Sequence, residues 1–202
     1  MKKYCVIILF LSFLFDLNSC NKNNLIDPLA TIQQGMIPLK VGFKWTWNVT
    51  LFDATGKVVG SHVWSVEIVK DTMINNETWF IEKEGNTLSA YPITNRDGVT
   101  YSYSNGHASI LFNTVTEDTT LPSTNSNLSY LVSKNNFIHV PCGNFSCNNY
   151  RVYLDYHDKK ILIQNYYLEF NKGMIKTESF SVKSDGSQYI SATTELASTN
   201  AF

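Results

Sequence analysis

The clearest chemistry in the sequence belongs to its cysteine thiols, above all to the one that follows the N-terminal apolar run. Lys2 and Lys3 give the chain a positive start, and an apolar run of about 12 residues then extends to Phe15. A run of this length is typical of a secretory signal peptide, because a membrane-spanning helix needs roughly 20 residues. The pattern predicts export, with Cys20 a few residues beyond the run.

Leu17, Asn18, Ser19 and Cys20 resemble the lipobox of bacterial lipoproteins, in which an aliphatic residue, a tolerant position and a small residue precede an invariant cysteine. The resemblance implies cleavage before Cys20 and transfer of diacylglycerol to its thiol. An ordinary signal peptide with an incidental cysteine near its end is the alternative. We expect residues 1–19 to be a lipoprotein signal peptide.

Lipid on Cys20 would hold the chain at a membrane, because about two acyl chains suffice for stable anchoring. In the lipoprotein family a further fatty acid such as palmitate is added to the freed amino group, and an Asp directly after the cysteine can retain the protein at the inner membrane. Asn21 stands at that position here. The resemblance thus implies a cell-envelope protein at the outer membrane, on either its periplasmic or its surface face.

The mature chain is close to neutral. Loss of residues 1–19 removes two of 16 basic and one of 17 acidic side chains, which leaves a net charge of −2. Nucleic-acid binding relies on clustered Lys and Arg, so no nucleic-acid partner is expected.

The polar composition predicts a flexible tether over residues 20–37, with a short packed helix from Asp27 as the alternative. Residues 38–202 have the size of a single domain.

The domain begins with side chains that alternate between apolar and polar. Five apolar residues from Phe43 to Leu51 are separated by polar ones, a period of two that is typical of a half-buried antiparallel strand. Asp53 to Gly56 have turn composition, and alternation resumes from Trp64 to Ile68. We expect these two strands to form a hairpin.

The same alternation recurs along the rest of the chain. Further strand-like runs lie near residues 78–83, 99–103, 108–115, 137–140, 150–156, 161–170, 174–182 and 188–196. Turn signals such as Asp97-Gly98 and Asn105-Gly106 separate them, and no convincing amphipathic helix is present. The sequence predicts an all-β fold, an antiparallel meander that forms a barrel, a half-barrel or a sandwich. The polar segment 116–127 is predicted to be a mobile loop.

Short phrases along the domain resemble a loosely defined group of uncharacterised bacterial envelope lipoproteins. The phrases are Pro38-Leu39-Lys40-Val41-Gly42 with Trp45, Val140-Pro141 with Gly143 and Phe145, and Gly173-Met174-Ile175-Lys176. Asn171 stands where the group often has a first glycine, and Asn tolerates the positive φ that such a turn needs. The resemblance implies an extracytoplasmic β-rich domain and no catalytic residues.

Cys142 and Cys147 are the thiols that remain once Cys5 has left with the signal peptide and Cys20 has been lipidated. In an oxidising compartment, two cysteines this close in sequence favour a disulfide. The flexible Gly143-Asn144 pair could form a tight turn between them. We expect a local disulfide that contributes roughly 2 kcal/mol, with free buried thiols as the alternative.

The sequence indicates no cofactor, no metal site and no catalytic residue. His139 and His157 lie near the two late cysteines, but their spacing does not complete a zinc site. His107 and Ser109 are close in sequence without the pattern of a nucleophile elbow. A hydrolase whose site is not recognisable from sequence is therefore the alternative function.

Tryptophans are the remaining candidates for a binding site. Trp45, Trp47, Trp64 and Trp79 lie in predicted strands, and the simplest expectation is that they are core residues. A curved sheet could instead expose some of them in a cavity for a lipid, another hydrophobic ligand or a glycan. We expect a lipid-anchored envelope protein with a non-catalytic binding or interaction domain.

Overall fold

The computed structural model describes residues 32–112, 120–121, 127–156 and 159–202. Cys20, the predicted signal peptide and most of the predicted tether lie outside these residues. The predicted loop 116–127 also lies outside them, except for strand β8 and the first residue of β9. The described residues form β-strands and no helix, so the all-β prediction is confirmed. They accordingly contain no helix that could span a bilayer.

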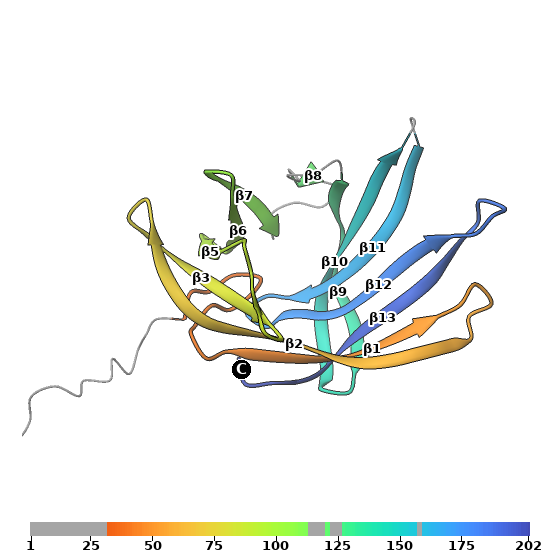
Figure 1. The fold of residues 1–202 in the computed structure, drawn as a ribbon, viewed down its shortest axis with the longest axis horizontal. Coiled ribbons are helices and arrows are strands. Elements are labelled where there is room, and N and C mark those ends of the chain that lie inside the picture. The colour runs from red at the N-terminus through yellow and green to blue at the C-terminus, as the bar shows by residue number, and fades with distance from the viewer. Residues whose placement is uncertain (1–31, 113–119, 122–126, 157–158) are drawn as a thin grey trace, which may run out of the picture. The chain divides into compact units, whose positions relative to one another are not determined.

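One antiparallel sheet contains all thirteen strands of the described residues. The strands are β1 (Lys44–Phe52), β2 (Val58–Ile74), β3 (Glu77–Glu84), β4 (Thr87–Leu88), β5 (Ile93–Arg96), β6 (Val99–Ser104), β7 (His107–Phe112), β8 (Thr120–Leu121), β9 (Asn127–Val140), β10 (Gly143–Tyr156), β11 (Lys159–Glu169), β12 (Gly173–Val182) and β13 (Gln188–Thr199). Their order is β7-β6-β5-β3-β2-β1-β13-β12-β11-β10-β9-β8, with β4 paired to β3. Strands that follow one another along the chain are therefore paired neighbours, except β4 with β5 and β7 with β8. The long-range β1–β13 pairing joins the two halves of the meander (Figure 1).

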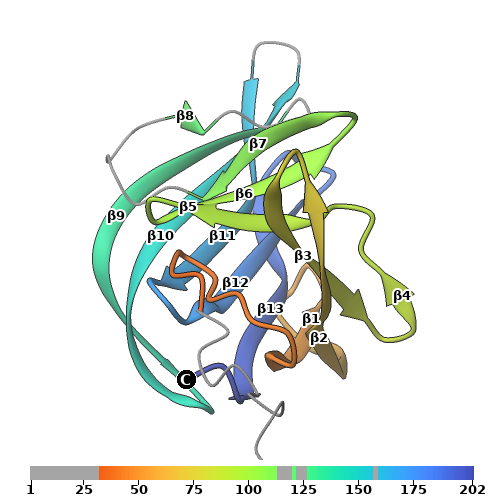
Figure 2. The same cartoon turned by 90° about the vertical axis from the view of Figure 1, so that its left-hand side faces the viewer.

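The sheet is open. Its order ends at β7 on one side and at β8 on the other, and no ladder joins these two strands in the described part of the chain. The long strands β9 and β10 bend strongly along their length (Figure 2). Of the three forms that the sequence left open, the curved half-barrel matches this arrangement.

The predicted turns form where Gly, Asn and Asp supply positive φ. Asp97 and Gly98 connect β5 to β6 with φ values of 50° and 81°, the conformation that favours a two-residue hairpin. Asn171, between β11 and β12, has φ of 59°, so the turn forms with Asn at the position where the lipoprotein group often has Gly. Its side chain also has a structural role, because Oδ1 accepts a hydrogen bond from the Gly35 N–H at 3.1 Å.

Residues 32–37 belong to the folded unit, although the sequence placed them in the tether. Met36 is completely buried. The Asn95 side-chain amide donates to the carbonyl oxygens of Gln33 and Ile37, both at 2.8 Å. These bonds fix the segment against β5, so the domain begins before the expected boundary at residue 38.

The hydrophobic core lies on the concave side of the sheet. Its main cluster unites side chains from both halves of the meander, including Trp47 of β1, Ile68 of β2, Ile93 of β5, Val140 of β9 and Ile175 of β12. Only the concave face can bring strands so far apart in the sheet order into contact. A second cluster forms around Met36, Leu131, Tyr150 and Leu168.

Candidate functional site

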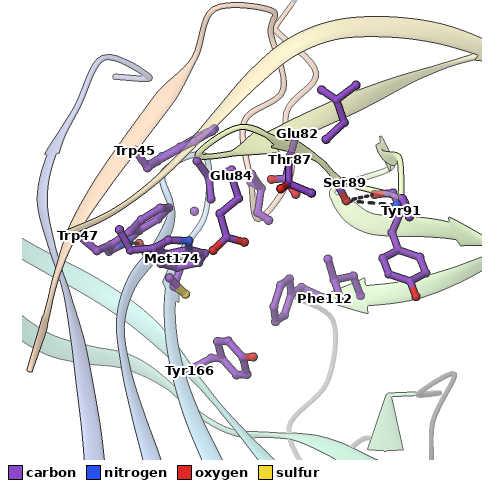
Figure 3. A pocket seen from close by; sticks show the side chains of 17 residues that line it. Trp45, Trp47, Glu82, Glu84, Thr87, Ser89, Tyr91, Phe112, Tyr166 and Met174 are labelled. Carbon is purple, nitrogen blue, oxygen red and sulfur yellow. Dashed lines mark hydrogen bonds between the residues drawn. The ribbon is translucent and has the colours of Figure 1, made fainter. Parts of the chain in front are cut away.

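A cavity of about 600 Å³ adjoins the main core cluster. Strands β1, β2 and β3 line one part of it, β7, β11 and β12 contribute further residues, and Ile37 and residues 87–91 complete the lining. Figure 3 shows Trp45, Trp47 and Met174 separated by open space from Phe112 and Tyr166. A cavity of this volume is in the range that accommodates a small-molecule ligand.

Three of the four tryptophans predicted as cavity candidates line this space. Trp45 and Trp47 are two residues apart on β1, so both side chains point to the same face of the sheet. Trp64 of β2 is the direct cross-strand partner of Trp47, and the two indole rings stack with their centroids 4.6 Å apart. The β1–β2 hairpin expected from the sequence therefore builds an aromatic wall.

The indole N–H groups of this wall are not equally satisfied. Trp45 Nε1 donates to the Lys172 carbonyl oxygen at 3.1 Å, and Trp47 Nε1 donates to the Met174 carbonyl oxygen at 3.0 Å. Both rings are thus fixed to the turn before β12 and the start of that strand. Trp64 Nε1 is buried and has no hydrogen-bond partner among the described residues. An unsatisfied buried donor costs about 1–3 kcal/mol, which an acceptor atom on a bound ligand would offset.

The remaining aromatic lining comes from strands distant in the sheet order. Phe112 lies at the end of β7 and Tyr166 on β11, and their ring centroids are 5.8 Å apart in an edge-to-face contact. Burial raises the pKa of the Tyr166 hydroxyl. The walls are therefore largely apolar, with a neutral phenol among them.

Two carboxylates supply the charge of the cavity lining. Glu82 and Glu84 lie two residues apart on β3 and therefore share one face of the strand. Glu84 is exposed and its side chain extends into the open space of Figure 3. Glu82 is half-buried, and loss of hydration raises the pKa of its carboxyl from 4.5 to about 7. A carboxyl in this state can hold or release a proton near neutral pH.

Trp79 does not line the cavity. It is three residues before Glu82 on β3, so its side chain points to the opposite face of the strand. It is 1% exposed and packs in a T-shaped contact with Tyr103 at 5.3 Å, with the Arg96 guanidinium 5.5 Å from its ring centroid. The structure therefore places Trp79 in a separate packing environment.

Cys142 and Cys147 are both free thiols in the structure, which is the alternative to the predicted disulfide. Cys142 lies in the β9–β10 turn, whereas Gly143 already begins β10 and Cys147 lies within that strand. Four residues of extended strand span about 13 Å, whereas bridged cysteines need α-carbons within about 7 Å. Burial, aided by the negative charge of Glu169, raises the pKa of the Cys147 thiol to about 12.

The other residues considered for chemistry do not converge. His107 and Ser109 both lie on β7, and no hydrogen bond joins their side chains in the described structure. His139 Nδ1 is 2.7 Å from Asn144 Oδ1 across the β9–β10 hairpin, and His157 lies outside the described residues. Within the described ranges, no three His, Cys, Asp or Glu side chains gather as a metal site would require.

Sequence reasoning missed the acidic part of the cavity. The available signal was the spacing of Phe80, Glu82 and Glu84, which are each two residues apart. This spacing places both carboxylates on the same face of the strand as the buried Phe80. Residues 87–91 carried no such pattern. Phe112 and Tyr166 could not be associated with the Trp47 wall, because their proximity depends on the curvature of the whole sheet.

Comparisons with known proteins identify similar folds. No protein-family model matches the chain, and no curated protein matches it. A protein of Bacteroides fragilis, provisionally described as an exported protein with a YmcC-like fold, matches with a TM-score of 0.50 and 11% identity, over 83% of this chain and 99% of that one. A provisionally described lipoprotein of Parabacteroides distasonis matches over the same shares with 11% identity and a TM-score of 0.47. At this identity, the Bacteroides likeness establishes the similarity of the fold alone.

Proposed function

We propose that the chain is a lipid-anchored protein of the cell envelope whose β domain binds a small hydrophobic ligand without catalysis. The observation that carries the proposal is the cavity of about 600 Å³ with the Trp47–Trp64 stack in its wall. The unpartnered Trp64 Nε1 supports it, because a ligand acceptor would satisfy this donor.

The proposed location rests on the sequence. The signal-peptide pattern and the lipobox-like residues before Cys20 support attachment by lipid, and Asn21 supports the outer membrane as the destination. The provisional description of the Bacteroides protein as exported is in keeping with this location. The domain would then act at a membrane, where apolar ligands are abundant.

A hydrophobic ligand fits the lining better than a glycan. The walls consist mainly of Trp, Phe, Met, Val and Leu side chains, and few polar groups face the space. One of these, the Ser89 hydroxyl, already accepts from the Tyr91 N–H at 3.1 Å. A sugar would leave many of its hydroxyl groups without partners, which is costly in a desolvated site.

The test uses the full-length lipidated protein in phosphatidylcholine vesicles and ω-bromodecanol as the ligand probe. Bromine quenches tryptophan fluorescence on contact, so occupation of the cavity should give saturable quenching. A Trp64→Phe variant should lose part of the quenched signal, because it removes a cavity tryptophan. The matched Trp79→Phe variant should keep it, because Trp79 does not line the cavity. Quenching that does not saturate, or that falls equally in both variants, would overturn the proposal.

A further inference from the structure

The charged groups of the cavity lining have one sign. Glu82 and Glu84 are its charged residues, and no Lys or Arg is among the described residues that line it. An anionic ligand such as a fatty acid or a phosphate ester would bring a second negative charge beside these carboxylates. Like charges in a site of low dielectric repel strongly, so the lining disfavours such ligands.

Glu82 also lacks the counter-charge that other acidic residues have. Glu169 pairs with Lys172 at 2.7 Å, and Glu178 pairs with Lys176 at 3.6 Å. Glu82 has no ion pair and no side-chain hydrogen bond with a described residue, although it lines a cavity whose other residues are mostly apolar or aromatic. A half-buried carboxylate without a partner is costly, and a ligand cation would offset that cost.

The aromatic walls favour the same kind of ligand. Tryptophan faces attract cations, and an apolar body gains by displacing water from the Trp, Phe and Met surfaces. We infer that the ligand is an amphiphilic cation, an apolar chain or ring with an ammonium group, whose apolar part contacts Trp47, Trp64 and Phe112 and whose ammonium lies beside Glu82 and Glu84. This inference rests on the proposed function and specifies the chemistry of its ligand.

Proton linkage adds an independent expectation. Glu82, Glu84, Tyr91 and Tyr166 are the titratable groups that line the cavity from β3, the segment after β4, and β11. Because burial raises the pKa of Glu82 to about 7, part of its population is protonated near neutrality. An ammonium ligand favours the ionised form, so binding should release a proton and should tighten as pH rises from about 6 to about 8.

The experiment compares three probes with the same chain, again by tryptophan quenching in phosphatidylcholine vesicles. The probes are ω-bromodecyl trimethylammonium, ω-bromodecanol and ω-bromodecanoate, each corrected for partition into protein-free vesicles. At about pH 8 we expect the ammonium probe to bind about tenfold more tightly than the alcohol and the carboxylate to bind most weakly. Glu82→Gln should remove most of the ammonium preference, and the alcohol should bind this variant at least as well as the wild type.

The outcomes separate the inference from the proposed function. Saturable binding of the alcohol with no ammonium preference overturns the inference and leaves hydrophobic binding intact. Failure of all three probes overturns both. If Glu82→Gln does not fold, as judged by near-ultraviolet circular dichroism, the wild-type pH series decides. The inference is supported if the affinity of the ammonium probe, divided by that of the alcohol probe, rises with pH. It is contradicted if this ratio of affinities stays constant.

Discussion

Trp47 and Trp64 are direct partners across the β1–β2 ladder, and their rings stack at a centroid distance of 4.6 Å and an interplanar angle of 27°. Trp47 is 4% exposed and belongs to the main core, whereas Trp64 is half-buried. Both rings line the cavity. The pair therefore connects the stability of the sheet to the shape of the candidate binding site.

Truncation at these two positions should have unequal effects on folding. Trp47→Ala is expected to lower the free energy of unfolding by about 3–5 kcal/mol, because it empties a core position, and Trp64→Ala should cost less. Denaturant unfolding measures both, with Val63→Ala as the control at an exposed position of β2. A double-mutant cycle should give a coupling of about 0.5–1.5 kcal/mol for the stack. Equal losses at the two tryptophans would contradict this assignment of core and wall.

The sequence predicted the local elements better than the arrangement that forms the site. Alternation from Phe43 to Leu51 identified β1, and Asp97-Gly98 identified a hairpin turn, because both depend on neighbouring residues. The β1–β13 pairing depends on residues about 150 positions apart, for which periodicity carries no register information. Packing of residues 32–37 was missed for the same reason, since Asn95 supplies the contacts.

Glu82 should make stability depend on pH in a direction unusual for an acidic residue. Its pKa is about 7 in the folded protein and near 4.5 when the chain is unfolded, so the unfolded chain loses this proton first. The free energy of unfolding should therefore fall as pH rises from about 4.5 to about 7, by a total on the order of 3 kcal/mol. The Glu82→Gln variant has no ionisable group at position 82, so its stability relative to the wild type should increase as pH rises across that window.

Unfolding of this variant and the wild type at about pH 4 and about pH 8 checks the expectation. Glu84→Gln is the matched control, because Glu84 lies on the same face of β3 but is exposed to water. A stability difference for Glu82→Gln that is the same at both pH values would show that the carboxyl remains hydrated.

Gly35 is a position where even a methyl group should be destabilising. A Cβ atom there would overlap the Asn95 carboxamide, whose oxygen accepts from the Thr100 hydroxyl at 2.7 Å and whose amide holds residues 32–37. We expect Gly35→Ala to lower the unfolding free energy by about 1–3 kcal/mol. Gly60→Ala is the control, since its Cβ would meet Leu51 Cδ1 at an ordinary 3.6 Å. Similar thermal midpoints for the two variants would rule out a tightly packed Asn95.

Asn171 combines a backbone role with a side-chain role, and two substitutions separate them. Asn171→Gly keeps access to the φ of 59° but loses the hydrogen bond to the Gly35 N–H, at a cost of about 1 kcal/mol. Asn171→Ala loses the bond and adds the strain of positive φ, a further 1–2 kcal/mol or so. Chemical denaturation should rank the wild type above Gly and Gly above Ala. An Ala variant as stable as the Gly variant would mean that the turn relaxes to another conformation.

The two late cysteines should differ in their accessibility to alkylation. Cys147 is completely buried and the pKa of its thiol is about 12, so little reactive thiolate exists and reagent cannot reach it in the folded protein. Cys142 is half-buried in the β9–β10 turn and should react first with iodoacetamide in unreduced, native protein. Cys147 should react only when denaturant unfolds the domain, and Cys142→Ser should leave its slow rate unchanged. Peptide mass measurement distinguishes the two sites. Peptides that stay linked and resist alkylation until they are reduced would establish a disulfide between Cys142 and Cys147, which the extended conformation of β10 argues against.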